Sequence, residues 1–515
     1  FKSMTKGVIV NDNVATVSQL YNLDSFDGWL AAVNLTNSSS MVFQNEAGFS
    51  FDLSHIAKDG YFYKQEQQDH VDGRDGTSYF KTIAPMLIMG YFEFVQNGLL
   101  KFIMNWVPPF KRAYFGSIYV KTTVDVFICY GFMLMIMMGH DYYNEILIGM
   151  FCITVFVYLF QGRKNPIMVN FWTTINPRPA FDLIMDEKKK DRASVRFTIV
   201  RMTKQYTLAL TVVAILAVDF PLLFDKRLMK TEDQGYSLMD LGVGTVMLSS
   251  AFGNRLILTH KSTIKRTHFW SDLKNSLTGN ILVTIAASIR FFLLTGIEYH
   301  DHVTEWGVHW NFYVTIACVN MLLVFIRSPK YVLIIAMMIV AVQEVLHIHF
   351  DALSYLYYAP RDSFFSANKE GFISLPGYFV ISLVGIHIGS LVYNCLIFED
   401  PITLHKTIKT KEGMVKRHEL EFSLFWQLIF WGFMFLALGE ASGYVFNISI
   451  RRLCNAAYVF TQIAGFFFMM AGTYFLERCM LERNENMTFK AIALKQFIFF
   501  IGCNLLCGLI NISVQ

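Results

Sequence analysis

The sequence predicts an all-α, polytopic membrane protein with about 12 (or 13) transmembrane helices in one bundle. Of its 515 residues, 54% are apolar and only 16% are charged, whereas a soluble chain of this size carries more charge. Apolar runs of roughly 18 to 22 residues, long enough to cross a bilayer as helices, recur along most of the chain. Alternation with a period of two residues is absent, so helical spans are expected.

Composition separates two regions of the chain. Residues 1–82 are polar, with Asp, Gly, Asn and Ser scattered throughout, and 64–77 has the Gln, Asp and Gly content of a loop. We therefore expect a polar N-terminal extension over 1–82, on the lumenal side, and a multi-pass transmembrane domain over 83–515.

About twelve spans are expected in the transmembrane domain. Their approximate limits are Ile83–Trp106, Thr123–Gly139, Asn144–Phe160, Tyr206–Phe224, Tyr236–Phe252, Gly279–Gly296, Trp306–Ile326, Tyr331–Phe350, Leu375–Phe398, Phe422–Leu438, Ala456–Phe475 and Ala491–Ser513. Glu93, Gln96 and Lys101 interrupt the first span, which is therefore the weakest of the set.

Basic residues alternate between the two sides of the predicted bundle. Well over half of the 44 lysines and arginines lie in one set of loops, at 111–121, 163–204, 255–274, 327–330, 406–417 and 478–490. Because cytosolic loops carry an excess of Lys and Arg, this set is expected in the cytosol and the other set on the lumenal side. Glycosylation sequons at Asn34, Asn37, Asn447 and Asn511 fall on the lumenal side, and one at Asn486 falls on the cytosolic side.

Several classes of site are not indicated by the composition. The net charge of +4 is small and spread over many loops, so no nucleic-acid partner is expected. The eight cysteines lie mostly inside apolar spans, as small core residues do. Glu298, His300, Asp301 and His302 have metal-ligand side chains, but a short acidic loop offers this spacing often and no second cluster completes a site. No metal is therefore expected.

An aspartate at the end of an apolar run is the most informative residue. Asp219 lies near the end of the run Tyr206–Phe224, and Lys230 follows shortly after. An ionisable group at membrane depth is costly, so it is a functional-site hypothesis. The alternative is a charged side chain that reaches the membrane interface without a catalytic role, and this residue alone does not decide between the two.

Four polar loops are expected on the lumenal side. They contain Asp219 with Lys230, then Glu298 to Asn311, Arg361 to Gly371, and Arg451 to Asn455. Loops far apart in sequence can meet at one side of a helical bundle, where a site for a polar headgroup would form. Simpler interpretations remain for single residues. Asp240 could be an interhelical contact worth about 1 kcal/mol, and His309 could be a packed histidine.

These motifs together resemble one family, the inositol acyltransferases of glycosylphosphatidylinositol (GPI) anchor biosynthesis. The matching segments are Ala214-Ile-Leu-Ala-Val-Asp219-Phe-Pro221, Gly235-Tyr-Ser-Leu-Met-Asp-Leu-Gly-Val-Gly244, Glu298-Tyr299, His302-Val-Thr-Glu-Trp-Gly-Val-His-Trp-Asn-Phe312, Phe364-Phe-Ser-Ala-Asn-Lys-Glu-Gly371 with Gly377-Tyr378, and Arg451-Arg-Leu-Cys-Asn455. They occur in the family's order and at close to its spacing. One departure is Phe224-Asp-Lys-Arg-Leu-Met-Lys230, where Lys226 and Arg227 lie close to Lys230.

The resemblance implies an enzyme of the endoplasmic-reticulum membrane. Its family transfers a fatty acyl chain, typically palmitoyl, from acyl-CoA to the inositol 2-hydroxyl of glucosaminyl-phosphatidylinositol. The resemblance implies these two lipids as partners, acyl-CoA as co-substrate and no permanently bound cofactor. The aspartate and lysine implicated in the family's catalysis match Asp219 and Lys230.

Acyl transfer to a hydroxyl needs a base, donors for the oxyanion and close positioning of both lipids. We expect Asp219 to be the base or to orient the inositol hydroxyl, Lys230 to bind the oxyanion or a phosphate, and His309 to be the alternative base. Residues expected to bind substrate are Asp240, Glu298, His302, Glu305, Asn311, Asn368, Lys369, Glu370, Arg451 and Arg452.

Two other functional classes stay open on the sequence. A lipid transporter or scramblase could carry the same polar residues, although transporters often show inverted repeats and no clear repeat is present here. A non-catalytic subunit of a GPI-processing membrane complex is the second alternative. The sequence does not indicate protein partners or the oligomeric state.

Overall fold

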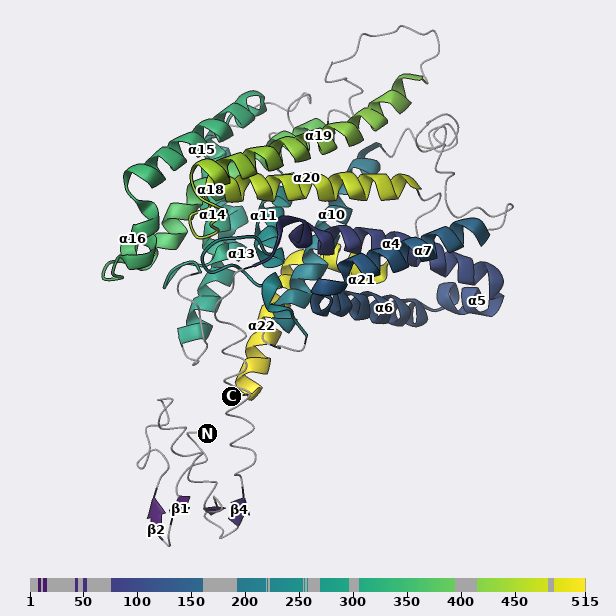
Figure 1. Cartoon of the computed structure of the whole chain (residues 1–515), viewed down its shortest axis with the longest axis horizontal. Helices are drawn as coiled ribbons and strands as arrows, with labels where there is room; N and C mark the ends of the chain where they lie inside the picture. Colours follow the sequence, from purple (N-terminus) through teal and green to yellow (C-terminus); the bar gives the residue numbers. More distant parts are fainter. Residues whose placement is uncertain are drawn as a thin grey trace. The chain divides into compact units, whose positions relative to one another are not determined.

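The computed structural model describes residues 8–10, 13–15, 42–44, 50–52, 76–160, 192–218, 220, 223–252, 254, 257, 269–295, 305–393, 415–479 and 486–514. The chain divides into two compact units. One comprises residues 1–73 with 219–221 and 508–515, and the other comprises 74–218 with 222–507 (Figure 1).

The N-terminal unit contains a small antiparallel sheet. Its strands are β1 (Val8–Val10), β2 (Asn13–Ala15), β3 (Val42–Gln44) and β4 (Ser50–Asp52), in the order β2-β1-β3-β4. The prediction of an all-α chain is therefore wrong for this segment. Valine, isoleucine and phenylalanine favour strands, and β1 and β2 are separated by Asn11-Asp12, residue types that suit a short hairpin connection. Runs of three residues are too short to stand out in a polar extension.

Helices dominate the second unit, and only residues 508–514 of α22 are counted with the first unit. Their bounds are α4 Tyr79–Trp106, α5 Pro108–Gly116, α6 Ile118–Met138, α7 Tyr143–Phe160, α10 Arg192–Ala217, α11 Leu238–Ala251, α13 Phe269–Thr295, α14 Phe312–Leu322, α15 Val332–His349, α16 Ala352–Tyr358, α17 Phe364–Ala367, α18 Lys369–Tyr393, α19 Val415–Val445, α20 Ala456–Cys479, α21 Met487–Leu494 and α22 Gln496–Val514. Short 3-10 turns are η1 His140–Tyr142, η2 Lys226–Leu228, η3 Leu323–Phe325 and η4 Pro329–Tyr331.

Every predicted span overlaps a helix of the structure. Among the described helices, seven are long and apolar enough to cross a membrane, and four shorter helices are also apolar. A mainly helical membrane architecture is thereby confirmed, whereas the number of spans stays a prediction. The shortest helices are the reason that the number of spans is not fixed. Helix α11 has 14 residues, or about 21 Å of helix, which is less than the thickness of the hydrocarbon core.

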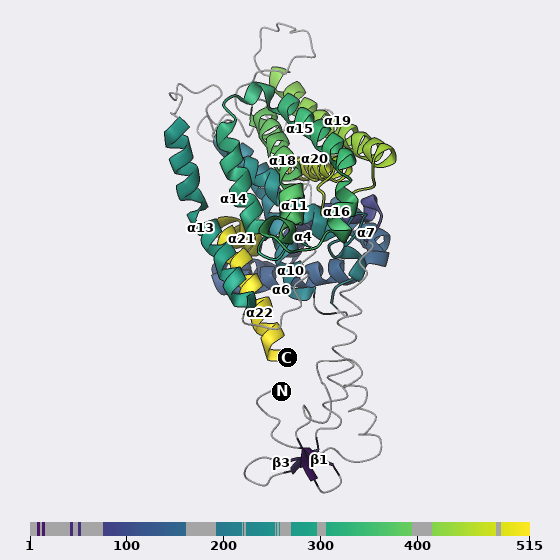
Figure 2. The same ribbon diagram turned by 90° about the vertical axis from the view of Figure 1, so that its left-hand side faces the viewer.

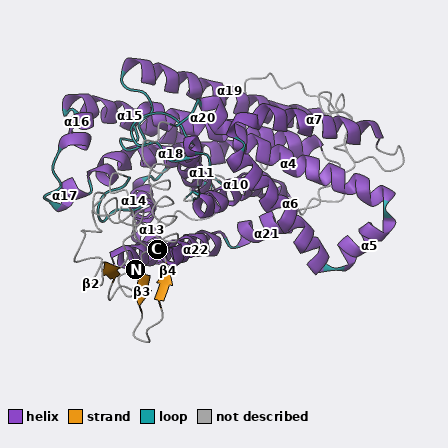
Figure 3. Ribbon diagram, turned by 60° about the horizontal axis from the view of Figure 1, so that its bottom comes forward, coloured by secondary structure: helices purple, strands orange, loops and turns teal. Residues whose placement is uncertain are grey.

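The helices of this unit form an inner and an outer set. Helices α4, α18 and α20 are buried along most of their apolar length, whereas α6, α7, α15 and α19 expose most of theirs. The short helix α11 is largely buried and packs against α10, α18 and α20. Figure 1 shows α19 beside α20, Figure 2 shows α13 beside α14, and Figure 3 shows α4 to α7 grouped on one flank. Exposed apolar outer helices are what lipid contact requires.

Helix α18 passes very close to the loop that precedes α20. A Cβ at Gly377 would collide with the carbonyl oxygen of Cys454. Cys454 itself has a positive φ of 47°. Small residues allow such close approach of backbones in membrane bundles. Gly377 therefore lets α18 lie directly against the N-terminus of α20.

We expect Gly377→Ala to destabilise the helical unit by about 1–3 kcal/mol, because the added methyl forces α18 away from Cys454. The thermal unfolding midpoint of the detergent-purified protein measures this. Gly149→Ala in α7 is the matched control, since nothing lies within 4 Å of a Cβ at that position. Equal midpoints for the two variants would contradict the prediction.

Candidate active site

The first turn of α11 carries a buried aspartate. Ser237 caps the helix, and its hydroxyl oxygen accepts the Asp240 N–H at 3.1 Å. The Asp240 carboxylate turns back toward the preceding loop, where Oδ2 accepts the Thr231 N–H at 3.1 Å and the Thr231 hydroxyl at 2.8 Å. A carboxylate in the first turn also interacts favourably with the positive end of the helix dipole. Asp240 therefore fixes the segment that directly follows Lys230.

Asp240 is also half of a buried ion pair. Its Oδ1 lies 3.0 Å from Nε of Arg451, which comes from the loop between α19 and α20. The two side chains are only 2% and 4% exposed. Each charge would be costly to bury alone, so the two must be kept together.

A second ion pair continues from the first. Arg451 donates from Nη1 to the carbonyl oxygen of Glu305 at 3.3 Å, and Oε1 of Glu305 lies 2.5 Å from Nζ of Lys230. Asp240, Arg451, Glu305 and Lys230 thus form a continuous polar chain across three loops. The outer pair is the more accessible one, because the Lys230 and Glu305 side chains are 23% and 14% exposed.

Aromatic rings enclose the inner ion pair. The Arg451 guanidinium lies 5.8 Å from the centre of the Trp306 ring, within cation–π range, and Trp306 lies 5.6 Å from Tyr378. Tyr458 donates its hydroxyl to the carbonyl oxygen of Asp240 at 3.2 Å. Within the described residues, the buried Trp306 N–H has no acceptor. A buried donor without a partner is uncommon in native proteins, so a bound water molecule is expected beside this N–H.

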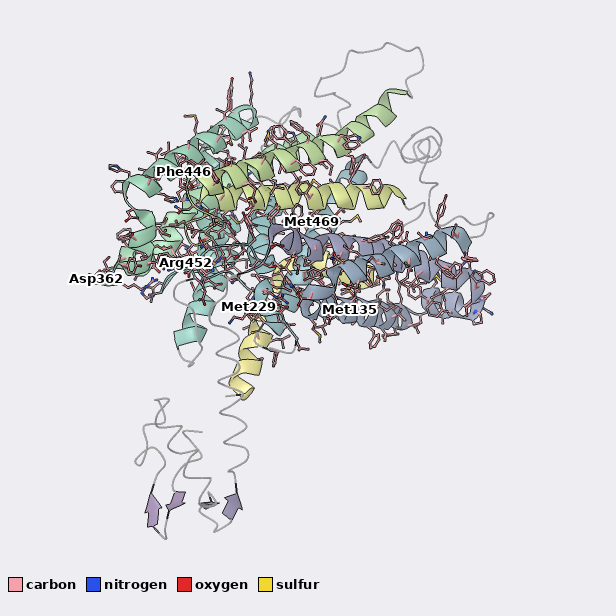
Figure 4. All side chains as sticks on the ribbon, in the orientation of Figure 1. Met135, Met229, Asp362, Phe446, Arg452 and Met469 are labelled. Carbon is pink, nitrogen blue, oxygen red and sulfur yellow. The ribbon has the colours of Figure 1, made fainter. Side chains whose placement is uncertain are left out.

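A neighbouring cluster is centred on Glu370, at the start of α18. Its carboxylate accepts from Arg361 Nη1 at 3.0 Å and from Arg452 Nη2 at 3.1 Å. The Arg452 guanidinium also lies 5.1 Å from the Tyr357 ring centre. Burial and the Asp233 carboxylate raise the pKa of Tyr357 to about 12, so this phenol is neutral near pH 7. Figure 4 labels Arg452 in this part of the helical unit.

The turn before α14 is held against α17 and α18. Val308 N–H donates to Ala367 O at 3.0 Å, and His309 N–H donates to Oδ1 of the fully buried Asn368 at 2.8 Å. Gly307 has φ +117°, and a Cβ there would lie 2.7 Å from Cα of Asn368. Only glycine suits this backbone. The exposed His309 side chain is thereby carried on a fixed turn, with its ring 6.3 Å from that of Phe364.

The comparison with known proteins decides the family. The GWT1 family model matches residues 63–515. The chain belongs to the GWT1 family. This confirms the interpretation that the motifs from Asp219 to Asn455 resemble the inositol acyltransferases of GPI-anchor biosynthesis.

Individual relatives align with most of this GWT1-family chain. GPI-anchored wall transfer protein 1 of Saccharomyces cerevisiae is 28% identical over 476 residues, covering 88% of this chain and 92% of the relative. Phosphatidylinositol-glycan biosynthesis class W protein of Dictyostelium discoideum is 24% identical over 496 residues, with the same coverage of 88% and 92%. GPI-anchored wall transfer protein 1 of Schizosaccharomyces pombe is 27% identical over 400 residues, covering 77% and 78%.

The structure of this GWT1-family protein brings many of the predicted site residues together. Lys230, Asp240, Glu305 and Arg451 form the polar chain, and Glu370 with Arg452 forms the neighbouring cluster. Three further predicted residues, Asp219, Glu298 and His302, lie outside the described residues.

Two predicted substrate-binding side chains are engaged within the protein. Asn311 caps α14, where its Oδ1 accepts the Val314 N–H at 3.1 Å and its Nδ2 donates to Ala287 O at 3.2 Å. Lys369 donates from Nζ to the carbonyl oxygens of Tyr355 and Ala359 at 3.2 and 2.7 Å, at the C-terminal end of α16. Both side chains are buried and connect helices in the described structure.

Sequence reasoning did not assign several residues that line the site. Four residues contact or adjoin the charged side chains but were not predicted to be site residues, namely Thr231, Trp306, Arg361 and Tyr378. Trp306 and Tyr378 lie inside the matching motifs, which is the only signal that could have identified them. Thr231 and Arg361 act through hydrogen bonds to residues nine positions away, a spacing that carries no sequence pattern.

The basic residues near Lys230 have different partners. Arg227 lies 2.7 Å from both Asp141 and Asp225 through Nη2. His140, Asp141 and Asp225 have ligand atoms within 4.8 Å of one another, but both carboxylates already pair with the Arg227 guanidinium, and Lys81 lies 3.5 Å from Asp141. Burial alone would raise the pKa of Asp225, and the hydrogen bonds from Arg227 outweigh it and hold that pKa below its usual value. Arg227 therefore belongs to this ion-pair cluster, whereas Lys230 contacts Glu305.

We expect Glu370→Gln to destabilise the protein by about 3–5 kcal/mol, because it leaves the buried Arg452 without a counter-charge. Arg361→Gln is the matched comparison. The Arg361 side chain is 25% exposed, and removing it preserves the Arg452–Glu370 pair, so a smaller loss of stability is expected. Thermal unfolding in detergent measures both. A loss for Arg361→Gln as large as that for Glu370→Gln would refute this account.

Proposed function

We propose that this chain transfers a fatty acyl group from acyl-CoA to the inositol 2-hydroxyl of glucosaminyl-phosphatidylinositol, in the membrane of the endoplasmic reticulum. Membership of the GWT1 family supports inositol acylation in GPI-anchor biosynthesis. The observation that carries the site assignment is a partly exposed lysine, Lys230, fixed by an ion pair within a largely buried polar network. The acyl-CoA donor, the palmitoyl length and about 12 spans are parts of this proposal.

The proposed reaction has two bond changes. The inositol 2-hydroxyl oxygen attacks the thioester carbonyl carbon while a base takes the hydroxyl proton. The carbonyl oxygen becomes an oxyanion, and the Lys230 ammonium supplies positive charge for it or for a lipid phosphate. The tetrahedral intermediate then re-forms its carbonyl and expels the CoA thiolate, which takes up a proton. The products are acyl-inositol and free CoA.

We assign Asp219 as the base or as the residue that orients the hydroxyl. It follows the last residue of α10, Ala217, by two positions, and an aspartate at the end of a predicted span has access to both hydrocarbon and water. His309 is the alternative base, because its exposed side chain is carried on the turn fixed by Asn368. The assignment of Asp219 depends on its match to the family motif.

We place the acyl chain in a groove between α13 and α14. The groove has a volume of about 840 Å³ and is mostly apolar, with Leu277, Ile281 and Ile285 on α13, Met321 on α14 and Phe325 on η3. Leu375 of α18 also lines it, one helical turn beyond Gly371. Trp310, in the turn before α14, packs directly against Gly371. The groove therefore shares α18 with Glu370 of the neighbouring cluster, which supports this placement.

We expect Asp219→Asn to abolish acyl transfer while the protein remains folded and inserted in the membrane, because the amide cannot accept the proton. Lys230→Met should lower the rate by about 100-fold or more, as the loss of an oxyanion donor does. The assay incubates purified protein with labelled acyl-CoA and glucosaminyl-phosphatidylinositol and measures acyl-inositol product.

The same assay separates the competing functions. Movement of the headgroup across vesicles without product would indicate a transporter, and neither activity would indicate a non-catalytic subunit. Near-normal acylation by Asp219→Asn would remove this carboxylate from the mechanism and leave His309→Gln as the variant to test.

We expect Ala317→Trp, which fills the groove, to shift the preference toward shorter acyl donors, since each buried methylene contributes about 1 kcal/mol to binding. Rates with a long and a short acyl-CoA are compared for each variant. The control is Ile148→Trp, at a 63% exposed position of α7 outside the groove. Unchanged chain-length preference for Ala317→Trp would mean that the donor chain binds elsewhere.

A further inference from the structure

We propose that Asp240 and Arg451 are positioning residues that hold Lys230 in place from two directions. This inference rests on the proposed function, because it assigns the pair a role in presenting the lysine of an acyltransferase. It changes the interpretation of Asp240 and Arg451, which the sequence predicts to bind substrate directly.

The first connection runs through the backbone next to Lys230. Thr231 directly follows Lys230, and both its N–H and its hydroxyl donate to Oδ2 of Asp240, at 3.1 and 2.8 Å. Asp240 is itself anchored in the first turn of α11 through Ser237. A loop residue with two hydrogen bonds to one rigid helix has little freedom to move. The main chain that carries Lys230 is therefore tied to α11.

The second connection runs through the side chain of Lys230. Its ammonium lies 2.5 Å from the Glu305 carboxylate, and the backbone carbonyl of Glu305 accepts from Arg451 at 3.3 Å. Arg451 is held in turn by Asp240 at 3.0 Å. Both connections therefore begin at Asp240. One leads to the backbone beside Lys230, and the other leads to the backbone of Glu305, the counter-ion of Lys230.

Burial argues against direct contact of the inner pair with substrate. The side chains of Asp240 and Arg451 are 2% and 4% exposed, whereas those of Lys230 and Glu305 are 23% and 14% exposed. Trp306 covers the guanidinium, and Tyr458 donates to the Asp240 carbonyl. A lipid headgroup can reach the outer pair and cannot reach the inner pair without opening the helical unit.

The pair is also suited to hold a geometry. In a weakly polarisable interior, an ion pair whose members are also tied by hydrogen bonds to Thr231 and Glu305 has few favourable arrangements, and removing either partner leaves an uncompensated charge. Catalysis is sensitive to such positions, since a misplacement of about 1 Å can lower a rate about 100-fold. A purely structural role would instead change the amount of folded protein and leave the rate of each folded molecule unchanged.

A cross-linking experiment tests the geometry without any assay of activity. Cysteines replace Lys230 and Glu305, and a short bis-methanethiosulfonate reagent is added to membranes. Both connections to Asp240 end on backbone atoms, so they survive these replacements. We expect efficient cross-linking with Asp240 and Arg451 intact. Asp240→Asn or Arg451→Met should reduce it to the level of the single-cysteine controls.

The controls separate a local effect from general unfolding. Asp125→Asn removes another fully buried carboxylate, one bonded to Tyr114 and Met487, and should leave the cross-link intact. If Asp240→Asn does not fold, the double variant Asp240→Asn/Arg451→Met removes both charges and leaves none unpaired. Unchanged cross-linking in a folded variant that lacks Asp240 would overturn the proposal.

Kinetics provide the second readout. Arg451→Lys keeps a positive charge beside Asp240 but lacks the guanidinium fork that also reaches Glu305. We expect near-normal stability, kcat lowered about 100-fold and a nearly unchanged KM. Activity that simply follows the amount of folded protein would show a structural role only. Absence of acyl transfer in the unaltered protein, with cross-linking intact, would refute the proposed function and leave the geometry standing.

Discussion

A buried ion pair between Asp240 and Arg451 is the constraint on which the candidate site depends. The two residues are more than 200 positions apart, yet their charged atoms lie 3.0 Å apart with almost no exposure. Because each charge is stable in the interior only with the other present, the first turn of α11 and the loop before α20 must meet. The positions of Glu305 and Lys230 follow from that meeting.

The helices make this meeting possible by bringing several of their ends together. The close approach at Gly377 sets α18 against the loop before α20, and Gly307 lets the turn before α14 lie on Asn368. Helix α15 contributes as well, since Glu344 accepts the Ala456 N–H at the start of α20 at 2.5 Å. A negative side chain at a helix N-terminus is favourable. Apolar packing and these few polar contacts together place the polar loops next to one another.

The fold was more predictable than the roles of single residues. A helix covers each apolar run because the length of the run reflects the thickness of hydrocarbon, and the family motifs identified most of the loops that meet. Residue type did not predict exposure, however. Asn311 and Lys369 use their polar atoms within the protein, and Asp240 and Arg451 face each other rather than solvent. The short strands in residues 8–52 were missed because three-residue runs carry little periodic signal.

The sequence by itself determined the membrane class, the location of the helices, the family and the short list of charged residues that deserve a role. These follow from hydropathy, helix length and motif order, which are properties that residues close together in the sequence determine. Only the tertiary structure decided which charge pairs with which and which of them stays accessible. Those pairings join loops separated by 75 to more than 200 residues. They form because a lone buried charge is costly, and that cost depends on how the surrounding protein packs.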